Sequence, residues 1–376
     1  TVTDTCTVTV KDSTPLCFEK DTPNDEDTNI WFEVQPAKEY MFKLQYTKNL
    51  ADPQSWQDWE FESETQGTSK KILLSDGEKL YVKSKDIISL GAFGFSFKME
   101  GGKIKSSGDI SSIGDPGAPS SFKGAFKGCT LLTTAPDLPG LTIGNSSYES
   151  MFEGCTSLSQ APQLPATTLH NASYKCMFKN TGIKEIPNLP CLDLQGWCYQ
   201  EMFCGCHELL PSSQEFFLPA LSIPVFGYDG MFKSSSINAV PILPAENLDH
   251  SCYASMFENC DNLTNQVFTL PAKNAIDDFE YSKMFAECDN LERGPHISAL
   301  DPKNYSLDSM FLNCPKLNYL EVDFGKPDSQ EWPELMIIDW IDESTIGTFV
   351  WNGSLLGPET RSNDTVPASW TIKNYE

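Results

Sequence analysis

The chain has 376 residues, 40% of them hydrophobic and 11% aromatic, so it is long enough for two folded domains and a large core. Its formal net charge of −25 disfavours nucleic acid and anionic membrane surfaces as partners, because both carry negative charge. The sequence has no apolar run of about 18 residues, so no membrane-spanning helix is predicted.

Residues 1–30 are polar and acidic, and we predict that they form a linker or a flexible N-terminus. Cys6 and Cys17 lie within this segment, and the sequence leaves open whether they form a disulfide. Thr1 is not a natural initiator, and no signal peptide is recognisable. We therefore expect a processed chain from which an export signal or a lipid anchor has been removed.

Residues 31–115 are predicted to form a β-rich N-terminal domain that caps a solenoid predicted for residues 116–324. Short runs rich in β-branched and aromatic residues predict its strands: Trp31–Val34, Tyr40–Tyr46, Trp59–Phe61, Ile72–Leu74, Leu80–Val82 and Ala92–Met99. The pairs Asp76-Gly77 and Gly101-Gly102 are typical of hairpin turns. We therefore expect the strands to be antiparallel.

Residues 116–324 contain a repeat of about 26 residues, marked by the dipeptide Met-Phe. Its phenylalanine occurs eight times, and Ala125 replaces the Met of the first copy: Phe126, Phe152, Phe178, Phe203, Phe232, Phe257, Phe285 and Phe311. A repeat of this length predicts a solenoid, in which each copy stacks on the next and buries a continuous core.

The residues before each Met-Phe pair predict a short helix. An apolar side chain stands four residues before each phenylalanine: Phe122, Tyr148, Tyr174, Tyr199, Tyr228, Tyr253, Tyr281 and Leu307. Positions −4, −1 and 0 share one helix face, and Ser147, Ser173 or Ser251 is placed to cap the helix start. A Gly or Asn in the left-handed conformation is expected to end the helix in six copies: Gly128, Gly154, Asn180, Gly205, Asn259 and Asn313.

A cysteine follows this helix end in six copies: Cys129, Cys155, Cys206, Cys260, Cys288 and Cys314. Since equivalent positions stack along a solenoid, we predict a row of buried, reduced thiols. The two copies without the cysteine, at Asn180–Ile183 and Ser234–Ile237, are one residue shorter. A Leu-Pro pair then recurs and predicts a strand of about two to four residues, with the proline at or beyond its end.

These patterns predict an α/β fold. We expect a right-handed leucine-rich-repeat solenoid of about eight repeats, with short parallel strands on one side and short helices on the other. After the last copy, Trp332, Trp340, Trp351 and Trp370 occur without the repeat register. Residues 325–376 are therefore predicted to form a C-terminal cap.

The repeat Tyr148–Leu169, with its Met-Phe, Gly-Cys and Leu-Pro steps, resembles the BspA-like leucine-rich repeat proteins of bacterial cell surfaces, which are abundant in gut Bacteroidetes. Gly108–Ser112 resembles the domain that precedes those repeats, and Ile346–Ile372 resembles their ending. The resemblance covers residues 30–376. It implies a secreted or lipid-anchored surface protein that binds something outside the cell, with no catalytic motif to carry over and no single ligand.

The sequence predicts no catalytic, cofactor-binding or metal-binding residue, and no enzyme activity. The four histidines, His170, His207, His250 and His296, lie in different repeats, so a histidine base beside a nucleophile is not expected. The sharpest metal candidate is a cluster of five residues: Cys191, Cys198, Cys204, Cys206 and His207. Zinc binding, a local disulfide and unpaired packing are all open for it, and we favour packing.

Two functions remain from the sequence. The first is a non-catalytic adhesion or binding protein that recognises an extracellular host or bacterial protein. We expect such a protein to be a monomer at the cell surface or outside the cell, held by an outer-membrane lipid anchor. The second is a carbohydrate-binding protein of a glycan-uptake system. Exposed aromatic platforms favour the second. The residues between the inward leucines are Thr, Ser, Gln, Asp, Asn and Glu, so we favour the first.

Overall fold

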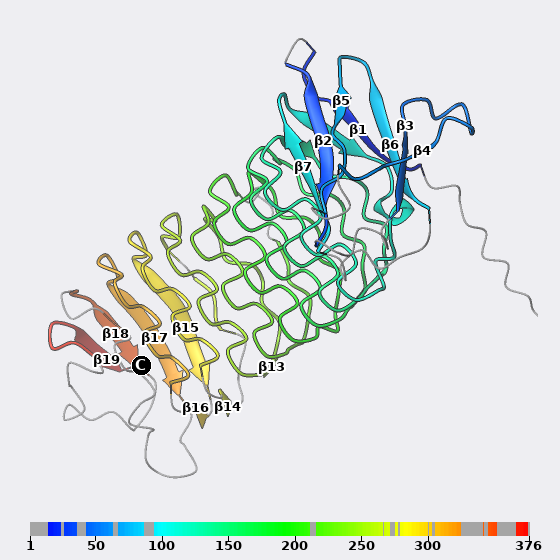
Figure 1. Cartoon of the computed structure of the whole chain (residues 1–376). Coiled ribbons are helices and arrows are strands. Elements are labelled where there is room, and N and C mark those ends of the chain that lie inside the picture. The colour runs from blue at the N-terminus through cyan, green and yellow to red at the C-terminus, as the bar shows by residue number, and fades with distance from the viewer. Residues whose placement is uncertain are drawn as a thin grey trace, which may run out of the picture.

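The chain folds into a long β-solenoid of about eight turns with two antiparallel sheets at its N-terminal end, as the computed structural model shows (Figure 1). The structure describes residues 14–23, 26–35, 43–62, 67–85, 94–210, 216–265, 267–270, 275–276, 279–299, 301–302, 305–324, 341, 345–351 and 366–374. Cys6, Trp332 and Trp340 lie outside these residues. One hydrophobic core runs through both parts of the chain.

The N-terminal part consists of a six-stranded and a three-stranded sheet. The larger sheet has the order β4-β3-β6-β1-β8-β9, with β1 Leu16–Lys20, β3 Leu44–Thr47, β4 Gln57–Asp58, β6 Lys79–Ser84, β8 Ile104–Ser107 and β9 Leu132–Thr134. The smaller sheet has the order β5-β2-β7, with β2 Thr28–Glu33, β5 Ile72–Leu74 and β7 Ser96–Glu100. Apart from the parallel pair β8–β9, neighbouring strands are antiparallel, which confirms the predicted antiparallel domain.

Two details of the predicted domain are wrong. Leu16–Lys20 is not linker but β1, whose Leu16 and Phe18 are fully buried between β6 and β8. The predicted turns exist, with φ of 77° at Gly77 and 108° at Gly101, but they do not close hairpins. Each connects a strand of the small sheet to one of the large sheet, so each carries the chain between the two sheets.

The first coil of the solenoid is covered by the N-terminal sheets. β8 pairs in parallel with β9, which belongs to the first coil. The ring of Phe97 on β7 stacks on Phe126 at 5.2 Å, and the Phe97 carbonyl accepts a hydrogen bond from the Cys129 thiol at 3.2 Å. These contacts cover the apolar end that an isolated solenoid would expose to water.

Short parallel strands connect neighbouring coils, as predicted. Most are two residues long: β10 Thr142–Ile143, β11 Thr168–Leu169, β12 Ser222–Ile223, β13 Asn247–Leu248, β14 Ala275–Ile276 and β16 Asp301–Pro302. In the third coil the proline of the Leu-Pro pair, Pro165, precedes β11. The longer β15, Arg293–Ala299, contains Pro295, and its pairing is irregular between Arg293 and His296, because proline has no N–H for the ladder.

The predicted helices are wrong, and with them the α/β leucine-rich-repeat class. Among the described residues the one helical element is the 3-10 turn Ile110–Ser112. Around Met-Phe the chain instead forms what we call the turn ribbon, residues 120–129 and their equivalents. Every fourth residue of the ribbon is left-handed, as in the second coil at Ser146, Ser150 and Gly154 with φ of 54°, 55° and 77°. A right-handed helix cannot pass through such positions.

The hydrogen bonds of the turn ribbon explain its stability. Lys123 N–H donates to the Ser120 carbonyl three residues back at 3.2 Å, whereas Phe122 N–H donates to Ser147 of the next coil at 2.9 Å. Alternate amides therefore close local turns and bind the neighbouring coil. A two-turn helix would hold its amides within one coil and would be too short to be stable alone. The predicted cap Ser173 instead donates its hydroxyl to the Ile143 and His170 carbonyls.

Rows of equivalent side chains fill the core, as the repeat predicts. The eight register phenylalanines are fully buried, and their rings follow each other at 5.4–5.8 Å. The six tyrosines from Tyr148 to Tyr281 form a second buried row at 5.6–5.9 Å. Each coil therefore packs its apolar side chains against both neighbours, which no single coil could do alone.

The cysteine positions form a third buried row. The Cys155 and Cys206 thiols donate to the carbonyls of Phe126 and Phe178 in the preceding coils, each at 3.0 Å. In the two shorter copies the position is retained, because Thr181 and Ser235 occupy it at 4% exposure. Every cysteine in the described part of the chain is a free thiol.

The C-terminal segment continues the stack of parallel strands past residue 324. β15, β17 Tyr319–Phe324, β18 Thr348–Trp351 and β19 Thr371–Asn374 form one parallel sheet in this order. Trp370 is 2% exposed, and its Nε1 donates to Thr345 Oγ1 at 2.9 Å. Parallel strand pairing therefore continues beyond the last Met-Phe copy. The solenoid sheet extends past the boundary predicted at residue 325. The right-handed coiling stays a prediction.

Two adjacent glycine substitutions distinguish the turn ribbon from a helix. Ser255 is left-handed, with φ of 53°, whereas its neighbour Ala254 is not; both are half-buried. We expect Ser255→Gly to raise the free energy of unfolding by about 0.5–1 kcal/mol, because glycine removes the left-handed strain at a smaller entropic cost. Ala254→Gly should lower it by about 0.5–1 kcal/mol. Urea denaturation measures both, and a loss of stability in both variants would indicate a helix instead.

Candidate functional site

A row of partly exposed aromatic rings runs along the outside of coils four to eight. Four of its members stand two residues before the buried Tyr or Leu of their coil: Trp197, Phe226, Phe279 and Tyr305. In the sixth coil the place in the row is taken by His250. The centroids of neighbouring rings are 6.0, 5.7, 5.8 and 5.1 Å apart. We call these five residues the aromatic ladder.

The aromatic ladder faces solvent with its ring edges. Trp197 is 36% exposed, His250 is exposed, and the other three rings are half-buried. The rings of Trp197 and Phe226 differ in orientation by 18°, and those of Phe279 and Tyr305 by 4°. Since near-parallel neighbours cover each other's faces, a ligand meets ring edges at these two pairs, whereas the His250 ring is tilted by 57° and 60° against its neighbours.

The backbone under the aromatic ladder is unusual for such large side chains. Trp197, Phe226, Phe279 and Tyr305 have φ of 60°, 53°, 66° and 60°. This left-handed region is costly for bulky residues and persists where the surrounding structure imposes it. Hydrogen bonds between coils impose it here, because Trp197 N–H donates to Val225 and Phe226 N–H to His250. Smaller residues fill the same position elsewhere, so packing does not require aromatic rings there.

The aromatic ladder begins abruptly at Trp197. The equivalent positions of the first three coils hold small residues: Ser120, Ser146 and Ala172. All three are left-handed as well, so the backbone is the same and only the side chain changes. Ala172 N–H donates to the Gly196 carbonyl at 2.9 Å, which places this alanine directly beside the Trp197 coil. Among the described residues the ring of Trp197 pairs with that of Phe226 alone, so its face turned towards the third coil has no such ring against it.

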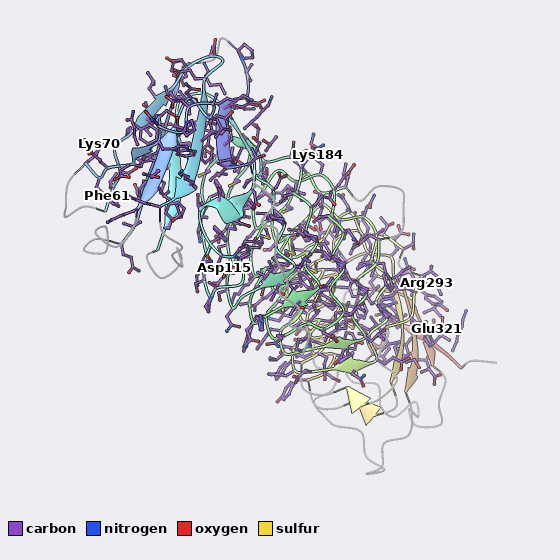
Figure 2. All side chains as sticks on the ribbon, turned by 90° about the vertical axis from the view of Figure 1, so that its right-hand side faces the viewer. Phe61, Lys70, Asp115, Lys184, Arg293 and Glu321 are labelled. Atoms are coloured by element: carbon purple, nitrogen blue, oxygen red, sulfur yellow. The ribbon has the colours of Figure 1, made fainter. Side chains whose placement is uncertain are left out.

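The surface near the aromatic ladder is polar and short of basic residues. The outward residues of the neighbouring strand row are Thr142, Thr168, Asp193, Ser222 and Asn247, all exposed. Between Glu185 and Phe232 the sequence contains no Lys or Arg. Lys184 lies just before that stretch, on the body of the solenoid (Figure 2). Leu192 and Leu221, 59% and 63% exposed, add apolar surface in the two coils where the ladder begins.

Charged groups on the turn ribbon are largely paired with each other across coils. Lys127 contacts Glu153 at 2.8 Å, and Lys233 contacts Glu258 at 2.8 Å. Towards the C-terminus Arg293 lies 3.5 Å from Glu321, and its guanidinium covers the Tyr319 ring at 4.1 Å. Figure 2 labels Arg293 and Glu321. Pairs at a partly exposed surface such as these contribute little to stability, but they leave the side chains less available to a charged ligand.

The structure separates the five residues of the predicted cysteine cluster. Cys206 lies in the core row, and His207 is exposed beside it. Cys204 is on the turn ribbon, half-buried. Cys191 and Cys198 donate to the carbonyls of Thr167 and His170 at 3.3 and 3.4 Å. No group of three potential metal ligands occurs in the described residues.

Burial makes the core thiols weaker acids than an exposed thiol. Desolvation raises the pKa of Cys129 and of Cys260 from 9.0 to about 12, and that of Cys206 to about 11. Because the thiolate is the reactive form, these buried thiols are poor nucleophiles at neutral pH. The four histidines lie apart: His250 belongs to the aromatic ladder, and His296 contacts Thr269.

A concave surface lies on the N-terminal sheets and is lined by Tyr46, Trp56 and Asp58 among others. Its polar groups are engaged with one another: Gln45 donates to Asp58 at 2.8 Å, and the Tyr46 hydroxyl donates to Gln57 at 3.2 Å. The Lys83 ammonium group covers the Trp56 ring at 4.1 Å. This surface therefore has fewer side-chain groups available to a ligand than the aromatic ladder has.

Sequence reasoning missed the aromatic ladder, although a signal was present. The position two residues before the buried Tyr or Leu is aromatic in four copies, but it lies outside the strand segments, where aromatic platforms were expected. No helix in the described part of the chain is long and apolar enough to cross a membrane. No protein-family model matches this chain, and comparison with curated proteins and with solved structures found no match either.

Proposed function

We propose that the chain is a non-catalytic binding protein of the bacterial cell surface, related to the BspA-like repeat proteins, that recognises an extracellular protein. The observation that carries this proposal is the aromatic ladder. Aromatic side chains are enriched in the centres of protein interfaces and supply much of their binding energy. Rings at a centroid spacing of 5.1–6.0 Å form a continuous strip, apolar except at His250, that an extended segment of a partner can cover.

The charge of the chain favours a partner with basic residues around an apolar centre. The formal net charge is −25, and in residues 128–272 basic side chains occur at Lys175, Lys179, Lys184 and Lys233 alone. Acidic residues such as Asp193 and Asp249 lie close in sequence to the ladder residues Trp197 and His250. Opposite charge at the rim of an interface speeds association and sets orientation. Such a surface suits a monomer that meets a host or bacterial protein outside its own cell, held to the outer membrane by a lipid.

The test is the binding of the chain to a panel of purified extracellular proteins, basic and acidic, before and after the aromatic ladder is altered. The double variant Phe226→Ser, Phe279→Ser should weaken the best basic binder at least tenfold, since two apolar anchors are lost. The control Leu50→Ser removes a 40% exposed apolar side chain from the N-terminal part and should bind as the wild type does. Surface plasmon resonance measures both.

Two outcomes contradict the proposal. One is equal affinity of the double variant and the control, which would place the partner elsewhere. The other is the absence of binding to every basic member of the panel. Added salt supplies a further check, because rim electrostatics predict slower association as ionic strength rises.

A further inference from the structure

We propose that the open face of Trp197 is a subsite for one neutral pyranose ring of a glycan. This inference goes beyond protein recognition, which uses the ring edges, and rests on a different feature: the place where the aromatic ladder stops. A flat, apolar ring face next to hydrogen-bonding side chains is the combination that a sugar needs, since one side of a pyranose carries C–H groups and its rim carries hydroxyls.

The spacing between neighbouring coils sets the space along the row that one stacked ring can occupy. Phe226 covers one face of Trp197 at 6.0 Å between centroids, with 18° between the rings. On the other face, one coil away, the equivalent side chain is the methyl group of Ala172, whose amide is bonded to the Gly196 carbonyl at 2.9 Å. At this position the side chain of the third coil is therefore much smaller than the aromatic ring of the fifth coil. A pyranose stacked on Trp197 would occupy the next place in the row.

The polar partners are the amides of Asn145 and Asn171. Both are exposed and stand one residue before the small residues Ser146 and Ala172. The Asn171 side-chain oxygen lies close to Gly196, 3.7 Å from where a Cβ on this glycine would be, so it is next to the Trp197 coil. Asn145 accepts the Asn171 backbone N–H at 3.1 Å, which fixes the two residues relative to each other.

The same residues favour a neutral sugar over a charged one. An amide offers both a donor and an acceptor, which matches hydroxyl groups and carries no charge to recognise a carboxylate. The net charge of −25 also repels acidic sugars. An aromatic side chain of a protein could stack on the same face, and the experiment includes it as a competing ligand.

The experiment follows the indole N–H signals of the intact chain by NMR during titration. The chain has 8 tryptophans, and the Trp197 signal is identified by its loss in Trp197→Phe. The ligands are the methyl glycosides of glucose, galactose, mannose and N-acetylglucosamine with their linear trimers, methyl glucuronide, and N-acetyltryptophanamide. We expect a saturable shift of the Trp197 signal with at least one neutral glycoside, and at least tenfold weaker binding in Trp197→Ala and in Asn171→Ala.

Ala172→Phe is the decisive variant. Phenylalanine is already accommodated at this position in the fifth coil, at Phe226 with nearly the same φ, 53° against 56°, so the fold should tolerate it. The new ring would extend the aromatic ladder and cover the open face of Trp197. Glycoside binding should then be lost, while binding of a protein along the ring edges is kept or strengthened. Failure of this subsite and failure of the proposed function are therefore distinguishable.

Three results would overturn the subsite. The first is the absence of a saturable shift with every neutral glycoside at millimolar concentration, a range that weak single-sugar sites reach. The second is undiminished glycoside binding in Ala172→Phe. The third is stronger binding of methyl glucuronide or N-acetyltryptophanamide than of any neutral glycoside, which would assign the open face to another class of ligand.

Discussion

Between about pH 9 and pH 11 the solenoid is expected to lose much of its free energy of unfolding, because its buried thiols ionise only when it unfolds. Burial raises the pKa of Cys129 and of Cys260 to about 12 and that of Cys206 to about 11, against 9.0 for an exposed thiol. The protonated thiol is the form that the fold favours. Stability is therefore fully present below about pH 9 and falls as the pH rises towards the folded pKa values.

The expected size of the alkaline effect is large because the thiols act together. Each contributes a loss of about 1.4 kcal/mol for every pH unit above 9 until its folded pKa is reached. Desolvation also raises the pKa of buried tyrosines such as Tyr199 and Tyr253, so they add to the loss above about pH 10. Urea denaturation at a series of pH values, with reductant present, measures the slope.

A substitution in the cysteine row supplies the control for this prediction. Cys260→Ser places at that position the residue that Ser235 provides one coil earlier, buried at 4% exposure. The variant should fold, and its stability should fall less steeply with pH, by about 1.4 kcal/mol per unit above pH 9. Stability that stays constant up to about pH 11 would show that the thiols are exposed to solvent in the folded chain.

The repeat made the stacked core predictable from the sequence. The phenylalanines from Phe126 to Phe311 recur at nearly one spacing, and equivalent residues of a solenoid must stack, so their burial follows from the period alone. The short parallel strands follow for the same reason. The cysteine row was also predictable, although Thr181 and Ser235 show that the position accepts a hydroxyl as well as a thiol.

The local backbone around Met-Phe was not predictable, because a helix and the turn ribbon have the same pattern of apolar residues. Apolar residues at −4, −1 and 0 lie on one face of a helix, but they also point inward from a ribbon whose left-handed residues recur every four positions. Gly154 and Asn180 are residue types that favour the left-handed conformation, whereas Ser150 and Cys176 adopt it although their residue types do not predict it. The hydrogen bonds that impose it come from the next coil, about 26 residues away, beyond the reach of local propensity.

The aromatic ladder was hidden for a different reason. Core positions recur in every copy, but a binding surface is made of residues that differ between copies, such as Ala172 against Phe226. A single sequence shows that the residue type differs between copies, but it does not show that the side chains of neighbouring copies are in contact. The structure supplies that knowledge, because it places Trp197 and Phe226 at 6.0 Å although 29 positions separate their residue numbers.

Phe178→Ala is expected to lower the free energy of unfolding by about 3–5 kcal/mol, because it removes the fully buried third ring of the phenylalanine row. The ring stacks on Phe152 and Phe203, at 5.7 Å to each, so both neighbouring coils lose contact. Since a solenoid is held by nearest-neighbour interfaces, the loss should divide its unfolding into two transitions, one on each side of the third coil. Urea denaturation followed by tryptophan fluorescence measures the cost and shows the second transition. Phe217→Ala, at a site 50% exposed, removes the same ring from the surface and should cost less than about 1 kcal/mol. Equal losses in the two variants would mean that the row does not couple the coils.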